Sequence, residues 1–169
     1  MNGPGNGYHA AMELRPIGRI RSPHVEQAGT PIQPAFGEPD ATTIVEVDPP
    51  YRDALADLDG FDRVWLLTHL DRAKAFRSRV VPYRDTVERG LFATRAPSRP
   101  NPIGLSCVAL RALDVARGLL TLGASDLLDG TPVLDIKPYI AGIDAFPDAR
   151  AGWFGASHEE RDKADDRFA

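Results

Sequence analysis

A proline-rich loop with two arginines is the part of this sequence best suited to bind a ligand. Residues 92–106 read FATRAPSRPNPIGLS and place three prolines between two apolar runs. Proline fixes φ and removes a backbone donor, so the loop has few conformations to lose on folding or binding. Arg95 and Arg99 add about ten N–H donors in rigid planar forks. We therefore expect this loop to form a binding site rather than a linker.

A second constrained turn carries carboxylates and a lysine. Residues 126–139 read DLLDGTPVLDIKPY, with Asp126, Asp129, Asp135 and Lys137 around the glycine of the turn. Aspartates on a rigid turn can accept the two hydroxyls of a ribose, or an ammonium group, in fixed geometry. Asp129 directly precedes glycine, a position where aspartate also stabilises turns locally. For Asp129 both interpretations stand, whereas the whole group favours a functional site.

Several common catalytic sites are absent from the sequence. The four histidines, His9, His24, His69 and His158, lack metal-ligand spacing, so we expect no metal. The sequence has no dinucleotide fingerprint, no Walker loop and no nucleophile elbow. The single cysteine, Cys107, lies in an apolar run and is expected to be a small core residue. Chemistry must then come from the two loops, which could catalyse group transfer by aligning two bound molecules.

Composition fits one cytoplasmic domain. The chain has 169 residues, 43% of them hydrophobic, and a net charge of −4. It shows no membrane-length apolar run and no secretion signal, and a lone cysteine suits the cytoplasm. Residues 61–100 carry nine Lys/Arg against four Asp/Glu, a local charge of +5. That stretch could face RNA or a phosphorylated ligand, or could be a solvated basic surface.

The apolar pattern predicts a mainly β fold: a compact single-domain β-barrel with one or two short helices. Expected strands are residues 13–20, 42–47, 63–70, 91–94, 103–115, 119–122 and 133–139, with a hairpin turn at 116–118. Asp48 should cap a short helix that directs Leu55 and Leu58 inward. We expect residues 1–11 to be a disordered tail, residues 12–155 the barrel domain, and residues 156–169 a charged tail that is helical or frayed.

Four segments of the sequence resemble the TsaA-like, or TrmO, family. Residues 92–106 and 126–139 are similar to its two long signatures, and they occur in the same order. Residues 17–23 (IGRIRSP) resemble its opening strand, and residues 58–65 (LDGFDRVW) its middle strand. The likeness runs from about Leu14 to Pro147. It implies a compact β-barrel methyltransferase that uses S-adenosylmethionine, is usually a homodimer, and methylates N6 of threonylcarbamoyladenosine beside the anticodon of certain tRNAs.

The resemblance also implies residue roles. The cofactor site would comprise Pro34, Ala35, Phe36, Asp71, Arg95, Leu105, Gly123 and Asp126. Arg99, Asn101 and Tyr139 match positions that shape the substrate pocket. At the position of Asp71 the family often has histidine. Many bacterial relatives carry a further C-terminal domain, whereas this sequence has 30 residues after Tyr139, so it is expected to be a short form.

The expected reaction is direct attack of the acceptor nitrogen on the methyl group. Asp126 or Asp129 could accept the proton, and Lys137 could instead orient the carbamoyl oxygen. Alignment alone could supply much of the rate. Two alternatives remain open: methylation of a small molecule, and a non-catalytic module that binds S-adenosylmethionine.

Overall fold

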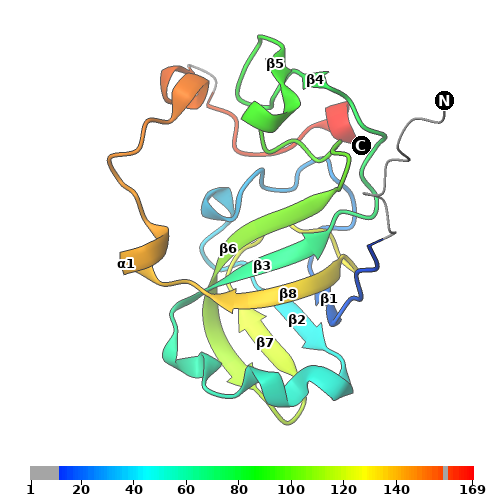
Figure 1. Ribbon diagram of the computed structural model, residues 1–169, viewed down its shortest axis with the longest axis vertical. Helices are drawn as coiled ribbons and strands as arrows, with labels where there is room; N and C mark the ends of the chain where they lie inside the picture. Colours follow the sequence, from blue (N-terminus) through cyan, green and yellow to red (C-terminus); the bar gives the residue numbers. More distant parts are fainter. Residues whose placement is uncertain (1–11, 158–159) are drawn as a thin grey trace, which may run out of the picture.

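Six antiparallel strands close into a barrel, as the sequence predicts. The computed structural model describes residues 12–157 and 160–169, and the expected tail at residues 1–11 lies outside them. The order around the barrel is β1-β2-β7-β6-β3-β8 (Figure 1). The strands are β1 (Gly18–Arg21), β2 (Thr43–Val47), β3 (Arg63–His69), β6 (Ile103–Asp114), β7 (Leu119–Leu122) and β8 (Pro132–Pro138).

Alternating side chains fill the barrel. Every second residue of β2 and β3 is buried, and Val45, Val64 and Leu66 are fully shielded from solvent. Apolar residues of all six strands join one core, as the period-two pattern of half-buried strands requires. At one barrel end the buried positions become polar: Thr43 and Ser125 share a hydrogen bond of 2.9 Å. This end, where β3 finishes and β6 begins, supports the functional site.

Short helices connect the strands. They are the 3-10 helices η1 (Pro34–Phe36), η2 (Pro49–Leu55), η3 (Leu58–Gly60), η4 (Leu91–Ala93), η5 (Gly152–Ala156) and η6 (Asp166–Phe168), and the single-turn α1 (Ala141–Asp144). No helix in the described part of the chain is long and apolar enough to cross a membrane.

Three local predictions need correction. Residues 91–94, expected as a strand, instead form η4 and its C-cap Thr94, because the Thr94 N–H and hydroxyl both donate to the Leu91 carbonyl and close a turn. Asp48 occupies the N-cap of η2 without a side-chain capping bond, although Leu55 is buried as expected. The first strand begins at Gly18 rather than at residue 13, after Pro16, whose ring removes a backbone donor.

The C-terminal segment, whose folding the sequence left open, packs against the loops above the barrel. Residues 160–169 lie beside the small sheet of β4 (Arg79–Val80) and β5 (Arg89–Gly90) (Figure 1). The Gly29 N–H donates to the Ala164 carbonyl and the Ala164 N–H donates to the Thr30 carbonyl, at 2.9 and 2.8 Å. Phe168 is 4% exposed and packs in a small apolar cluster with Val80, Leu91, Ala96 and Tyr83.

Candidate functional site

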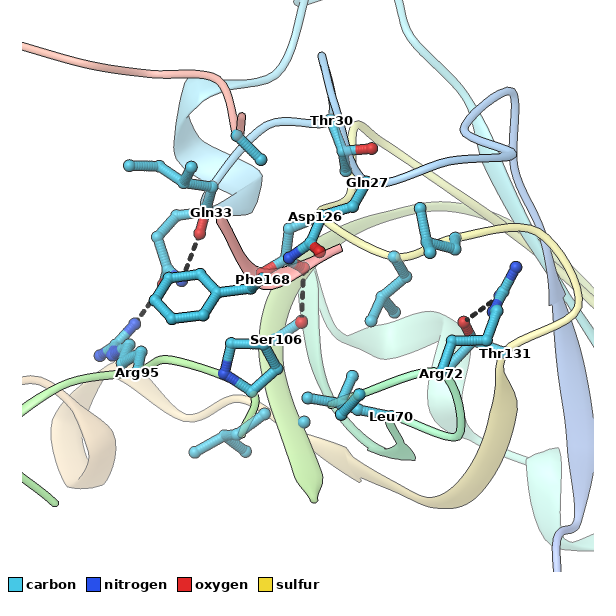
Figure 2. A pocket seen from close by; sticks show the side chains of 18 of the residues that line it. Gln27, Thr30, Gln33, Leu70, Arg72, Arg95, Ser106, Asp126, Thr131 and Phe168 are labelled. Atoms are coloured by element: carbon cyan, nitrogen blue, oxygen red, sulfur yellow. Dashed lines mark hydrogen bonds between the residues drawn. The ribbon is translucent and has the colours of Figure 1, made fainter. Parts of the chain in front are cut away.

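The proline-rich loop and the aspartate turn, far apart in the sequence, meet at this end of the barrel. Between them lies a cavity of about 350 Å³. Arg95 and Leu105 come from the first segment, and Asp126 and Thr131 from the second. The loop at residues 27–33, residues 70–73 after β3, and the C-terminal segment complete the walls (Figure 2). One cationic and one anionic wall therefore border the same space.

Asp126 is an acidic residue of this cavity whose pKa is raised. The Ser106 hydroxyl donates to its Oδ1 at 2.6 Å. Burial raises the pKa of Asp126 from 3.8 to about 6, and the Ser106 bond and the charge of Arg95 only partly oppose this rise. The buried Ser125 hydroxyl, bonded to Thr43, also accepts from the Leu127 N–H at 3.4 Å and fixes the backbone beside it. A carboxylate with such a pKa can exchange a proton near neutral pH.

Two arginines of the proline-rich loop have different surroundings. Arg95 reaches across the cavity and donates to Oε1 of Gln33, whereas Arg99 donates to the backbone carbonyls of Thr94 and Ala96 at 3.0 and 3.3 Å. Arg99 thus holds the loop in shape, whereas Arg95 links the loop to Gln33 on another wall of the cavity.

Arg72 fixes the aspartate turn and was not singled out by the sequence analysis. Its guanidinium donates to the Asp129 carbonyl at 2.7 Å and to the Thr131 hydroxyl at 3.2 Å. It also lies 3.6 Å from the Asp71 carboxylate. The one signal in the sequence was its position next to Asp71, immediately after β3.

The structure brings five of the predicted site residues to the cavity: Asp71, Arg95, Arg99, Leu105 and Asp126. Gln33, Ser106, Thr131 and Phe168 join them without having been predicted as site residues. Gln33 directly precedes the expected Pro34–Phe36 segment, and Ser106 and Thr131 lie inside the two signatures. Phe168 gave no signal, because only the folded chain brings it near residues 80–96.

The other predicted residues lie beside this cavity or elsewhere, and their roles stay predictions. Pro34, Ala35 and Phe36 form η1, one residue beyond Gln33, and the Phe36 ring lies 5.1 Å from the Arg84 guanidinium. Gly123 is buried, with its N–H donating to the Ala109 carbonyl. Asn101 is exposed just before β6.

The remaining candidates are held by other contacts. The Asp129 carboxylate accepts from the Ser22 N–H at 3.1 Å, which ties its turn to the residues that follow β1. Lys137 is largely exposed and pairs with Asp135 at 2.8 Å. The Tyr139 ring packs edge-on against Trp65, with centroids 5.7 Å apart.

The fold and site define a class of small closed β-barrels with a ligand cavity at one end, bordered by an arginine loop and an aspartate turn. The model of the tRNA-methyltransferase O N-terminal domain matches residues 19–145. The chain therefore belongs to the TrmO family.

Relatives and solved structures agree with this assignment. The chain is 42% identical over 133 residues to an Archaeoglobus fulgidus protein named S-adenosyl-L-methionine-binding protein, covering 79% of this chain and 93% of that one. It is 38% identical over 152 residues to the Escherichia coli tRNA (adenine(37)-N6)-methyltransferase, covering 85% of this chain and 64% of the relative. The crystal structure of TrmO from Pseudomonas aeruginosa matches with a TM-score of 0.70 and 41% identity, over 85% of this chain and 62% of that chain. The chain thus spans less than two thirds of these last two proteins.

Proposed function

We propose that this chain is an S-adenosylmethionine-dependent methyltransferase that methylates N6 of threonylcarbamoyladenosine next to the tRNA anticodon. One observation carries the proposal: Arg95 and Asp126 face a common cavity and are close enough to influence each other electrostatically. The relatives named for S-adenosylmethionine binding and for methylation of tRNA support it.

The residues around the cavity fit such a cofactor. Its volume of about 350 Å³ lies in the range of small-molecule sites. The carboxylate of Asp126 suits an ammonium group or ribose hydroxyls, the guanidinium of Arg95 suits a carboxylate, and Leu70 and Leu105 offer apolar surface. When bound, S-adenosylmethionine supplies a methyl group on a positively charged sulfur.

Asp126 is the proposed general base. Its Oδ1 is engaged by Ser106, which leaves Oδ2 to accept the proton from the acceptor nitrogen. With a pKa of about 6, Asp126 is mostly ionised at pH 7 and is a stronger base than an ordinary aspartate. Asp129 is less suited to this role, because its carboxylate already accepts from the Ser22 backbone. Arg95, which donates to Gln33, orients the ligand and takes no part in the proton transfer.

The purified protein should convert threonylcarbamoyladenosine in tRNA to its N6-methyl form when S-adenosylmethionine is supplied. Mass spectrometry of the tRNA nucleosides measures the product. Cofactor binding without transfer to any tRNA would favour the non-catalytic module, and methylation of a small metabolite instead would favour the other alternative.

The proposal includes a homodimer in the cytoplasm. Ile103 and Leu105 on β6 are 42% and 54% exposed beside the cavity, so a second subunit could cover apolar surface there. If the partner completes the site, specific activity should fall on dilution.

Arg95→Ala is expected to weaken S-adenosylmethionine binding by about 10- to 100-fold, because a charge-assisted hydrogen bond contributes about 1.5–3 kcal/mol. Isothermal titration calorimetry measures the affinity. Arg117→Ala is the matched control, since Arg117 lies in the hairpin after β6, at the other end of the barrel. Equal affinities for the Arg95 variant and the control would remove Arg95 from the cofactor site.

A further inference from the structure

We propose that a second hollow, the aromatic groove, binds a nucleotide of the single-stranded RNA acceptor. The groove adjoins the cofactor cavity, measures about 560 Å³, and is lined by Arg84, Phe92, Arg95, Trp153, Phe154 and their neighbours. This inference rests on the proposed function and names where its substrate lies.

The chemistry of the lining suits a base attached to a phosphate backbone. Among the residues that the structure describes, five aromatic rings and two arginines line the groove, and none of these lining residues is an aspartate or glutamate. Phe92 and Phe154 are 77% and 47% exposed. Aromatic faces bind nucleobases by stacking, and arginines neutralise phosphates. A purely apolar partner would gain nothing from the two cations.

The rings are held in place before any ligand arrives. The Trp153 Nε1–H donates to the Ala93 carbonyl at 2.7 Å, and the Arg89 guanidinium lies 5.6 Å from its ring. The Arg84 guanidinium lies 5.4 Å from the Phe154 ring. A fixed platform loses little side-chain entropy when a base stacks on it.

The groove and the cavity share part of their walls. Gln33, Thr94, Arg95, Pro97 and Phe168 line both spaces. Transfer between two bound molecules requires adjoining sites that hold donor and acceptor in a common geometry. A nucleotide in the groove would therefore lie next to a cofactor in the cavity, with Arg95 contacting both spaces.

Part of the groove lies beyond the segment that matches the family model. Trp153, Phe154 and Phe168 follow residue 145, where the match to the family model ends. The matched segment supplies Phe92 and Arg95, and the residues after it supply further rings. Recognition of RNA around the modified nucleotide is accordingly assigned to a surface that both segments build.

The test titrates the 169-residue protein with an anticodon stem-loop RNA and follows tryptophan fluorescence. The chain has two tryptophans, so the Trp65→Phe variant reports on Trp153 alone. We expect RNA to quench this emission, and we expect Phe92→Leu with Phe154→Leu to weaken RNA binding by about tenfold or more. Affinity for S-adenosylmethionine should change less than about twofold in that double variant, because neither ring lines the cofactor cavity.

Phe146→Leu is the control, since Phe146 is 74% exposed and lies outside the groove. Unchanged RNA affinity in the double variant would overturn the inference. The inference would also be overturned if the double variant dissociated a dimer and still bound RNA, because the groove would then be a subunit interface. If RNA binds through the groove but is not methylated, the proposed function fails and the groove assignment stands.

Discussion

Asp126→Asn should abolish most methyl transfer and, at neutral pH, make the protein more stable. As the general base, Asp126 is expected to contribute about 10²- to 10⁴-fold to the rate, and an amide cannot accept the proton. The substitution keeps an oxygen able to accept the Ser106 hydroxyl bond. The loss should therefore appear in kcat, measured with saturating tRNA and S-adenosylmethionine.

The stability gain follows from the raised pKa. Because the folded-state pKa of Asp126 is about 6 and the ordinary value is 3.8, the folded protein holds this proton more tightly than the unfolded chain. Ionisation therefore costs stability as the pH rises from about 4 to about 6, and the cost is complete above that range. The difference corresponds to up to about 3 kcal/mol. Asparagine does not ionise and avoids the cost.

Thermal unfolding of both proteins at pH 4 and pH 7.5 measures this effect. The melting temperature of Asp126→Asn should exceed that of the natural chain at pH 7.5, and the difference should shrink at pH 4. Asp114→Asn is the control, because Asp114 accepts from the Arg117 N–H in the β6–β7 hairpin, away from the cavity. An active Asp126→Asn variant, or a gain independent of pH, would contradict the assignment. Asp129→Asn should remain active if Asp129 only stabilises the turn.

The barrel could be predicted because its signal is local. The apolar and β-branched runs at residues 42–47 and 63–70 predicted strands, and the structure forms β2 and β3 there, with Val45, Val64 and Leu66 buried. The two signature loops could likewise be singled out, because proline restricts the backbone and the arginine and aspartate side chains add charge at the same places. That these loops would face each other follows from barrel closure, which the resemblance implied.

What the sequence could not predict depends on the folded chain. Asp126 and Asp129 were equivalent candidates from the sequence. In the structure, the Ser106 hydroxyl donates to Asp126 and the Ser22 N–H donates to Asp129, and this difference separates their roles. Trp153 and Phe168 contribute because the chain after residue 150 packs against residues 80–96. That segment is charged and irregular in sequence, so nothing local indicated that it would form walls.

Phe168→Ala is expected to release the C-terminal segment and to lower S-adenosylmethionine affinity by about tenfold. Removing a buried phenylalanine costs about 3–5 kcal/mol. The apolar cluster around Phe168 is separate from the barrel core, so the loss should open this segment locally rather than unfold the barrel. Opening removes two residues, Ala164 and Phe168, from the wall of the cofactor cavity.

Hydrogen exchange on Phe168→Ala measures the release of the C-terminal segment, and calorimetry on the same variant measures its affinity for S-adenosylmethionine. The amides of Gly29, Ile32 and Ala164, which pair the loop with the C-terminal segment, should exchange faster. Amides of β3 should stay protected, and the melting temperature should fall by only a few degrees, because the barrel keeps its own core. Phe146→Ala provides the control, since that ring is largely exposed. Faster exchange with unchanged cofactor affinity would show that the segment covers the site without contributing to it, whereas a parallel loss establishes that a binding wall is built from the last ten residues of the chain.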